Sequence, residues 1–168
     1  MSKEPRRPGR HFLQIPGPTP VPERVLQAMS RQILDHRGPD FQRLGKSVLA
    51  GVKGLFKTKN PVIIYPASGT GAWEAALCNT LSPGDKVLMV ETGQFAVLWQ
   101  QMADRLGLIP DVIATDWRIA VDANQIEAKL RADKGHSIKA VCVVHNETST
   151  GCCTRLDEVR KAIDAAGH

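Results

Sequence analysis

The 168-residue sequence lacks any apolar run approaching the ~18 residues that a membrane span needs. Its basic first ten residues lead into proline-rich chain rather than into the apolar core of a secretory signal. Hydrophobic residues make up 42% and charged residues 23%, which is an ordinary globular composition. We therefore expect a soluble, cytoplasmic protein that has no membrane partner.

Signatures of metal and nucleic-acid binding are also scarce. The four cysteines form no Cys-x-x-Cys pair, so zinc-ribbon and thioredoxin-like sites have no support and we expect no metal. The first 60 residues hold 12 of the 22 Lys and Arg residues but 4 of the 17 Asp and Glu residues. Because aromatic residues amount to 5% of the chain, this basic half favours a solvated helical surface over a nucleic-acid partner.

The first 59 residues divide into an arm and two helices. Five prolines in residues 1–20 oppose helix formation and predict an extended N-terminal arm. In residues 21–59, apolar side chains recur three and four positions apart, which predicts two helices. The second runs to about Lys57, and the first starts at Pro22 and carries Val25, Leu26, Met29 and Ile33 on one face. These apolar stripes are expected to cover another surface.

From residue 60 onward, short apolar runs alternate with amphipathic segments. The runs predict strands at 61–65, 86–90, 111–114 and 138–144. The segments between them predict helices over 69–81, over the stretch from Phe95 to Leu106, after an N-cap at Asp122, and from Thr154 to a C-cap at Gly167. This alternation is typical of βαβ units, so we predict an α/β fold with a mainly parallel sheet buried on both faces.

In sheets of this kind, ligands bind beyond the carboxyl ends of the strands. After the first predicted strand comes Pro66-Ala67-Ser68-Gly69-Thr70-Gly71-Ala72, where glycines admit a close ligand and the next helix offers free amides to an anion. This turn either binds a phosphate or needs glycine only for its backbone angles. A Walker loop is excluded because no Gly-Lys-Ser/Thr lies in such a turn, and a dinucleotide fingerprint is excluded because Glu74 replaces its third small residue.

Aromatic and polar residues follow two further strands. Phe95 comes just after 86–90, where its ring either covers a flat ligand or packs on the core. His145-Asn146-Glu147-Thr148-Ser149-Thr150-Gly151 follows 138–144, and so many hydrogen-bonding groups indicate a polar ligand site. A lone His145 fits a structural hydrogen bond better than a catalytic base. Together the three strand ends predict a pocket for a flat, phosphorylated heterocycle, which is the shape of pyridoxal 5'-phosphate (PLP).

The same segments resemble the class V PLP-dependent aminotransferases, and most of all serine–glyoxylate and alanine–glyoxylate aminotransferases. The likeness runs in order through Pro16-Gly17-Pro18-Thr19-Pro20, Asp35-His36-Arg37-Gly38-Pro39, residues 67–74, residues 82–85 and residues 145–151. It implies the large domain of fold type I (aspartate aminotransferase-like), with residues 60–168 as its first part, after the arm 1–20 and the two-helix interface segment 21–59. It also implies PLP as the cofactor, a small amino acid and a 2-oxo acid as substrates, and a homodimer.

The resemblance also assigns roles to individual residues. It places Ser68, Gly69 and Thr70 in the turn that holds the cofactor phosphate. It matches Phe95 to the aromatic that stacks on the ring, Thr148 to the hydroxyl residue near the ring oxygen, with Glu147 beside it, and Gly17 and Pro18 to a segment near the substrate mouth.

The resemblance further implies that these 168 residues are a truncated form with no catalytic residue of their own. The family's Schiff-base lysine, the acid at the pyridine nitrogen and the arginine for the substrate carboxylate are expected after His168. None of the ten lysines is placed to reach a ring between residues 68, 95 and 148. We expect amino transfer from serine or alanine to glyoxylate, with no activity of this chain alone. The alternatives are another class V enzyme, such as a desulfurase, or a non-catalytic fragment that binds phosphate or a partner subunit.

Overall fold

The computed structural model describes residues 13–15 and 17–168. The chain forms two compact units, residues 1–64 and residues 65–168, and each is described by itself. Most of the predicted N-terminal arm lies outside the described residues. Among those that are described, no helix is long and apolar enough to cross a membrane.

The first unit contains the two predicted helices. They are α1 (Glu23–Met29) and α2 (Pro39–Leu55), and Pro39 occupies the first turn of α2, where its missing amide costs nothing. The prediction that Ile33 extends the apolar face of α1 is wrong. The helix ends at Met29, and the hydroxyl of its C-cap residue Ser30 donates to the Leu26 carbonyl. Ile33 lies beyond the helix and is 94% exposed.

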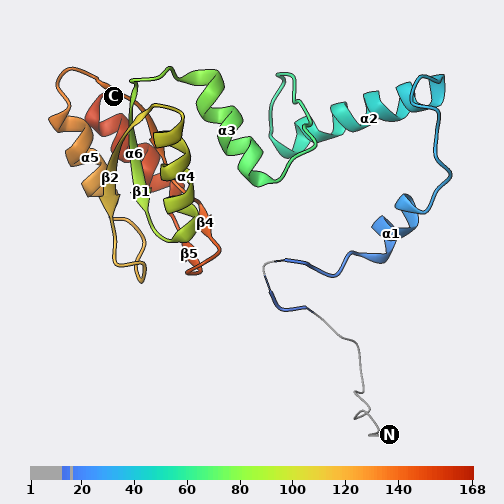
Figure 1. Cartoon of the computed structure of the whole chain (residues 1–168), viewed down its shortest axis with the longest axis horizontal. Coiled ribbons are helices and arrows are strands. Elements are labelled where there is room, and N and C mark those ends of the chain that lie inside the picture. The colour runs from blue at the N-terminus through green and yellow to red at the C-terminus, as the bar shows by residue number, and fades with distance from the viewer. Residues whose placement is uncertain (1–12, 16) are drawn as a thin grey trace, which may run out of the picture. The chain divides into compact units, whose positions relative to one another are not determined.

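The second unit begins with a helix and alternates strands and helices thereafter (Figure 1). Its elements are α3 (Gly69–Thr80), β1 (Lys86–Glu91), α4 (Gln94–Arg105), β2 (Ile109–Ala114), α5 (Ala123–Ala132), β3 (Ile138–Cys142), β4 (Asn146–Glu147), β5 (Cys152–Cys153) and α6 (Leu156–Ala166). The predicted caps are present at two of these helices. The Asp122 carboxylate accepts from the Asn124 amide at 2.9 Å, and Gly167 adopts a φ of +72° at the end of α6.

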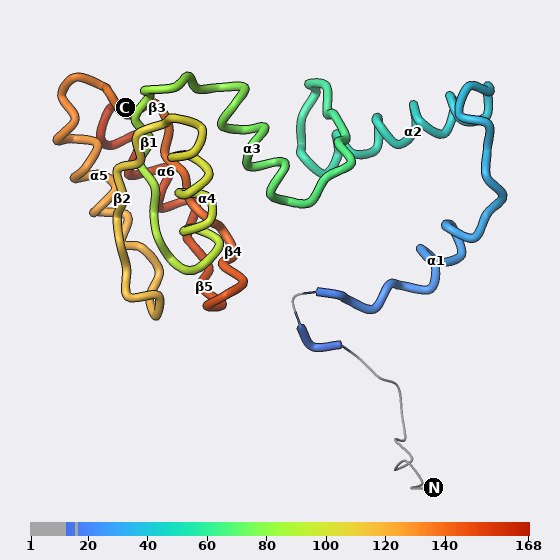
Figure 2. The backbone as a smooth tube through the Cα atoms, viewed as in Figure 1, coloured from blue at the N-terminus to red at the C-terminus, as the bar shows by residue number. Residues whose placement is uncertain are grey.

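The main sheet has three parallel strands in the order β2-β1-β3, which confirms the predicted parallel α/β architecture. Figure 2 traces the chain from β1 through α4 to β2 and on through α5 to β3. Glu91 pairs with Ala114, and Met89 pairs with Cys142, so the carboxyl ends of all three strands lie at one edge. The short strands β4 and β5 form an antiparallel pair just after β3.

Alternate residues of β1 face two separate hydrophobic cores. Leu88 and Val90 pack in a cluster with α5 and α6, whereas Val87 and Met89 pack in a cluster that contains Leu77 of α3 and residues of α4. This central strand is therefore buried on both faces, as its continuous apolar sequence predicts. The residues that follow β1 are therefore attached to a strand that is buried on both faces.

One predicted strand is absent, and one helix begins later than predicted. Residues 61–65 form no strand, and Ile63, Ile64 and Tyr65 are exposed. β-prone residues form a strand only where a neighbouring strand accepts their hydrogen bonds, and no described strand pairs with this run. Thr154 does not cap α6, because its hydroxyl donates to the Val144 carbonyl at 2.7 Å and the helix begins at Leu156.

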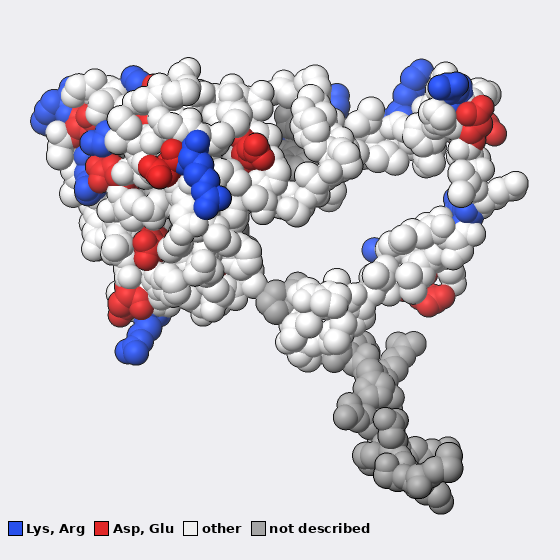
Figure 3. All heavy atoms as spheres, in the orientation of Figure 1, with Lys and Arg blue, Asp and Glu red and all other residues white. Residues whose placement is uncertain are grey.

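Basic and acidic side chains mix on one face of the second unit, as Figure 3 shows. Surface pairs such as Arg131–Glu127 and Arg160–Asp164 contribute to this mixture. This face presents no extended basic surface of the kind that binds a nucleic-acid backbone.

Candidate functional site

The carboxyl ends of β1 and β3 bring two loops together that lie more than fifty positions apart in the sequence. The first segment, residues 92–96, consists of Thr92 and Gly93 between β1 and α4 and the first residues of α4, and the second segment, residues 145–151, follows β3. Four hydrogen bonds connect them directly, from the amides of Gln94, Phe95 and Ala96 and from the hydroxyl of Thr150. The sequence placed both loops at one edge of the sheet, and the structure joins them.

The carboxylate of Glu147 is the centre of this junction. It is 1% exposed, and it accepts hydrogen bonds from the amides of Phe95 at 3.4 Å and Ala96 at 3.1 Å. It also accepts from the amide and the hydroxyl of Ser149, at 3.0 and 2.7 Å. The Ser149 hydroxyl oxygen in turn accepts from the Gln94 amide at 2.9 Å. The first three amides of α4, which have no partners inside the helix, are thus capped by Glu147 and Ser149.

The electrostatics of Glu147 follow from these contacts. Burial alone raises the pKa of its carboxyl, but the hydrogen bonds from Ser149, Ala96 and Phe95 outweigh burial and hold the pKa below its ordinary value. The partial positive charge at the start of α4 acts in the same direction. Glu147 is therefore a carboxylate at neutral pH although it is buried.

Gly93 makes this arrangement possible. A β-carbon at this position would lie 2.5 Å from Glu147 Cγ and 2.6 Å from Ser149 Oγ, which is far inside van der Waals contact. Its φ of 163° is extended backbone, which any residue adopts. The glycine is needed here for space, not for its backbone angles.

Phe95 lies at the start of α4 next to two indole rings. Its ring meets Trp73 of α3 edge-on, with centroids 6.2 Å apart, and Trp73 stacks on Trp99 at 5.4 Å. Phe95 is 39% exposed, so it is not buried in either hydrophobic core. The role of Phe95 in covering a ligand stays a prediction.

The predicted phosphate-binding turn lies at the start of α3. Ser68 occupies the N-cap position, but its side chain makes no capping hydrogen bond, and Ser68, Gly69 and Thr70 are all exposed. A β-carbon on Gly71 would lie 2.7 Å from the Ala67 Cβ, so this glycine keeps the turn tight. The turn thus presents two hydroxyls and the uncapped amides of a 12-residue helix, which together suit an anion.

The remaining predicted residues have different surroundings. Thr148 is exposed between the two residues that bind α4. His145 is exposed, and its carbonyl accepts from the Thr154 amide at 2.7 Å, in keeping with a structural position. Gly17 and Pro18 belong to the first unit, so their substrate role stays a prediction.

Three residues of this region were not singled out in the sequence. They are Gly93, Ser149 and Thr92, whose hydroxyl is buried with no hydrogen-bond partner among the described residues. Gly93 and Thr92 stand at the end of a predicted buried strand, which is the one signal that marks them. Ser149 lies within the polar loop, but its bond to Gln94 spans 55 positions and follows from no local pattern.

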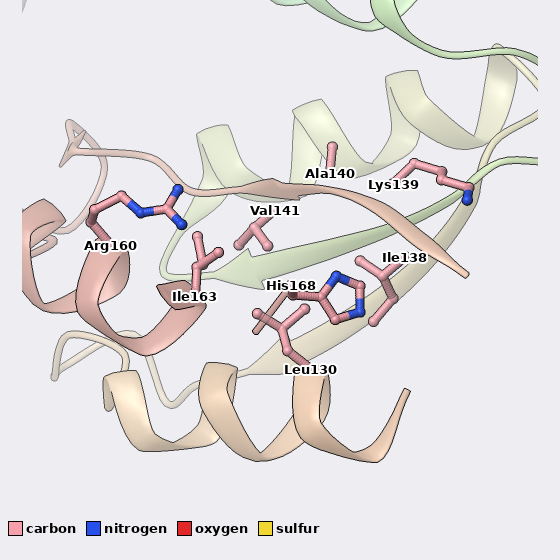
Figure 4. Close-up of a pocket in the computed structure, with 8 residues that line it drawn as sticks. All are labelled: Leu130, Ile138, Lys139, Ala140, Val141, Arg160, Ile163 and His168. Atoms are coloured by element: carbon pink, nitrogen blue, oxygen red, sulfur yellow. The ribbon is translucent and has the colours of Figure 1, made fainter. Parts of the chain in front are cut away.

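A separate cavity of about 260 Å³ lies along β3, and Figure 4 shows its lining. It is bounded by Ile138 and Lys139 at the start of the strand, together with Leu130, Ala140, Val141, Arg160, Ile163 and His168. None of the loops from the carboxyl ends of the strands lines it. This cavity is therefore distinct from the candidate site.

Comparisons with known proteins agree with this geometry. The family model "Aminotransferase class-V" matches residues 11–168. The chain is 53% identical to a serine–glyoxylate aminotransferase of Methylorubrum extorquens, over 97% of this chain and 41% of that protein. It is 46% identical to an L-aspartate–glyoxylate aminotransferase of Paracoccus denitrificans, over 92% of this chain and 39% of that protein.

A solved structure shares the fold. The alanine–glyoxylate aminotransferase of Nostoc sp. matches with a TM-score of 0.80 and 30% identity, over 99% of this chain and 44% of that one. The chain thus spans about two fifths of the length of its relatives. The predicted resemblance and the predicted fold class are both confirmed.

Proposed function

The chain belongs to the class V aminotransferase family, and on that premise we propose that it supplies the phosphate turn and the ring-covering aromatic of an enzyme that transfers an amino group to glyoxylate. The observation that carries this proposal is the 53% identity to a serine–glyoxylate aminotransferase. Glyoxylate recurs in the names of the relatives, whereas the donor is serine, L-aspartate or alanine. We propose serine or alanine as the donor, with L-aspartate as a second candidate.

PLP is the cofactor of this family, and the residues present fit it. The turn at 68–70 has the hydroxyls and free helix amides that a phosphate dianion needs. Phe95 is partly exposed, and its ring meets Trp73, which lies on the helix that follows this turn, edge-on. The Thr92 hydroxyl is a buried polar group without a described partner, which is a further donor near the strand end.

The proposed roles follow from these positions. When bound, PLP supplies the electron sink that lets an amino group move between an amino acid and a 2-oxo acid. Ser68, Gly69 and Thr70 would hold its phosphate, Phe95 would cover one face of its ring and exclude water there, and Thr148 would donate its hydroxyl near the ring oxygen. Glu147 is buried against α4. Its direct contact with the cofactor remains a prediction.

These 168 residues alone are proposed to be inactive. In the described part of the chain, no lysine lies in the turn at 66–71 or in the segments 92–96 and 145–151. Lys86 and Lys139 stand at the opposite, amino ends of β1 and β3. A lysine that transfers protons must reach the reacting carbon of the substrate within hydrogen-bonding distance. Lys86 and Lys139 lie at the edge of the sheet opposite the candidate site, so they do not reach it.

The two-helix segment 21–59 is proposed to contribute to a homodimer. Within the first unit, neither α1 nor α2 contains a buried residue. Phe41, Leu44 and Val48 of α2 recur at helical spacing and are exposed. An apolar stripe of this kind is stabilised when a second surface removes it from water.

The test uses the chain at its natural length, purified with PLP. Serine and glyoxylate should yield hydroxypyruvate and glycine, and sedimentation should give a dimer. The polypeptide 1–168 should give no products. Absence of PLP binding by the full-length chain would refute the proposal, and borohydride fixation of PLP to a lysine within residues 1–168 would refute the predicted inactivity.

A further inference from the structure

We propose that Glu147 is a positioning residue that orients Phe95 and Thr148 toward the cofactor without touching it. This inference rests on the proposed function, because it concerns the two residues that are proposed to face the ring. It differs from the prediction of a direct contact.

The first step is that Glu147 has no cationic partner among the residues that the structure describes. Among the described ion pairs, no Lys, Arg or His side chain lies within 4.0 Å of its carboxylate. A buried charge is costly unless polar groups compensate it. Here the compensation comes from the amides of Phe95 and Ala96 and from Ser149. The carboxylate is therefore committed to the first turn of α4.

The second step is that the junction fixes the backbone of Phe95 on both sides. The Gln94 amide is held by Ser149, and the Phe95 and Ala96 amides are held by Glu147. The Thr92 carbonyl accepts from the Thr150 hydroxyl at 3.1 Å. An anchored backbone restricts the positions that the ring can reach, whereas the first turn of an uncapped helix frays.

The third step concerns Thr148. It stands between Glu147 and Ser149, and both neighbours bind α4. The Gly151 amide also donates to the Glu147 carbonyl at 2.8 Å, which closes the loop after it. The same buried carboxylate therefore holds the proposed ring contact and the proposed hydroxyl contact in one frame. Loss of the charge should disturb both.

The experiment measures PLP binding by the full-length chain, with Glu147→Gln, Phe95→Leu and the double variant. Glutamine keeps the shape but places an amide donor against the α4 amides. We expect Glu147→Gln to weaken PLP binding about 10-fold, equivalent to about 1.4 kcal/mol, and to reduce the circular dichroism of the bound cofactor, which reports ring orientation. In the double variant, the loss should be smaller than the product of the two single losses, because Glu147 acts in part through Phe95 and coupled residues are not additive.

Glu127→Gln is the matched control. Its carboxylate pairs with Arg131 on α5, away from α4, and PLP affinity should not change. If Glu147→Gln does not fold, Ser149→Ala removes only the hydroxyl between Glu147 and Gln94, and should show a smaller loss that again depends on Phe95. Additive losses, or wild-type affinity and dichroism in Glu147→Gln, would overturn the inference alone. A wild-type chain that binds no PLP would instead refute the proposed function.

Discussion

Replacement of Gly93 by alanine should loosen the start of α4. The new methyl group would lie 2.5 Å from Glu147 Cγ and 2.7 Å from Glu147 Cδ, so the carboxylate must move. Overpacking of this kind typically costs about 1–3 kcal/mol. Hydrogen bonds to charged groups contribute about 1.5–3 kcal/mol, and displacement of Glu147 weakens those from Phe95 and Ala96. We therefore expect a local cost of about 3 kcal/mol.

Hydrogen exchange measures this cost at the place where it arises. Because 1.4 kcal/mol corresponds to a factor of ten, the amides of Phe95 and Ala96 should exchange about 100-fold faster in Gly93→Ala. A mass-spectrometric readout on the peptide that covers residues 92–100 is sufficient. The amides of the central strand β1 should retain their protection, because Val87 and Leu88 are fully buried and lie away from the new methyl group.

Gly135→Ala is the matched control, because a β-carbon there meets no atom within 4 Å. It should leave exchange in residues 92–100 unchanged. Equal protection of the Phe95 and Ala96 amides in the wild type and in Gly93→Ala would show that residues 145–151 move aside without a change in the free energy of local opening. The close approach of Glu147 to α4 would then have no energetic meaning.

Three further changes test separate features of the second unit. Asp111→Asn should lower the free energy of unfolding by about 1–2 kcal/mol at pH 7, because the hydrogen bond from Lys129 lowers the pKa of Asp111. A group whose pKa is lower in the folded state stabilises the fold at pH values above its pKa in the unfolded chain. Denaturant titrations should therefore show the difference between variant and wild type vanish as the pH falls through the folded-state pKa. Burial raises the pKa of the Cys142 thiol to about 11, so a thiol reagent at pH 8 should leave it unmodified in the folded chain. Asp122→Ala removes the cap of α5 and should cost about 1 kcal/mol in the same titrations.

Each of these has an internal comparison. Asp164→Asn breaks an exposed pair with Arg160 and should change stability little at any pH. Cys78 and Cys153 are exposed and should react with the thiol reagent, and modification of Cys142 at an equal rate would contradict its burial. Ser68→Ala removes an N-cap residue whose side chain makes no capping bond, so a loss as large as that of Asp122→Ala would contradict the described turn.

Local sequence predicted the elements that local physics controls. Alternating apolar runs and amphipathic segments predicted the helices of the second unit and the three strands of its parallel sheet, but not the short pair β4 and β5. Asp122 and Gly167 were correct as caps because a carboxylate before a helix and a glycine after it act on amides and carbonyls a few positions away. The run at 61–65 was misassigned because a strand requires a partner that β propensity does not supply.

The sequence by itself therefore determined the α/β class, the edge of the sheet where the candidate site lies, and the family of the chain. Only the tertiary structure decided that Glu147 turns inward to cap α4, that Ser149 completes this cap, and that Gly93 leaves the space for both. The physical reason is distance along the chain. Contacts across more than fifty positions depend on how the sheet brings β1 and β3 together, and no local pattern encodes them.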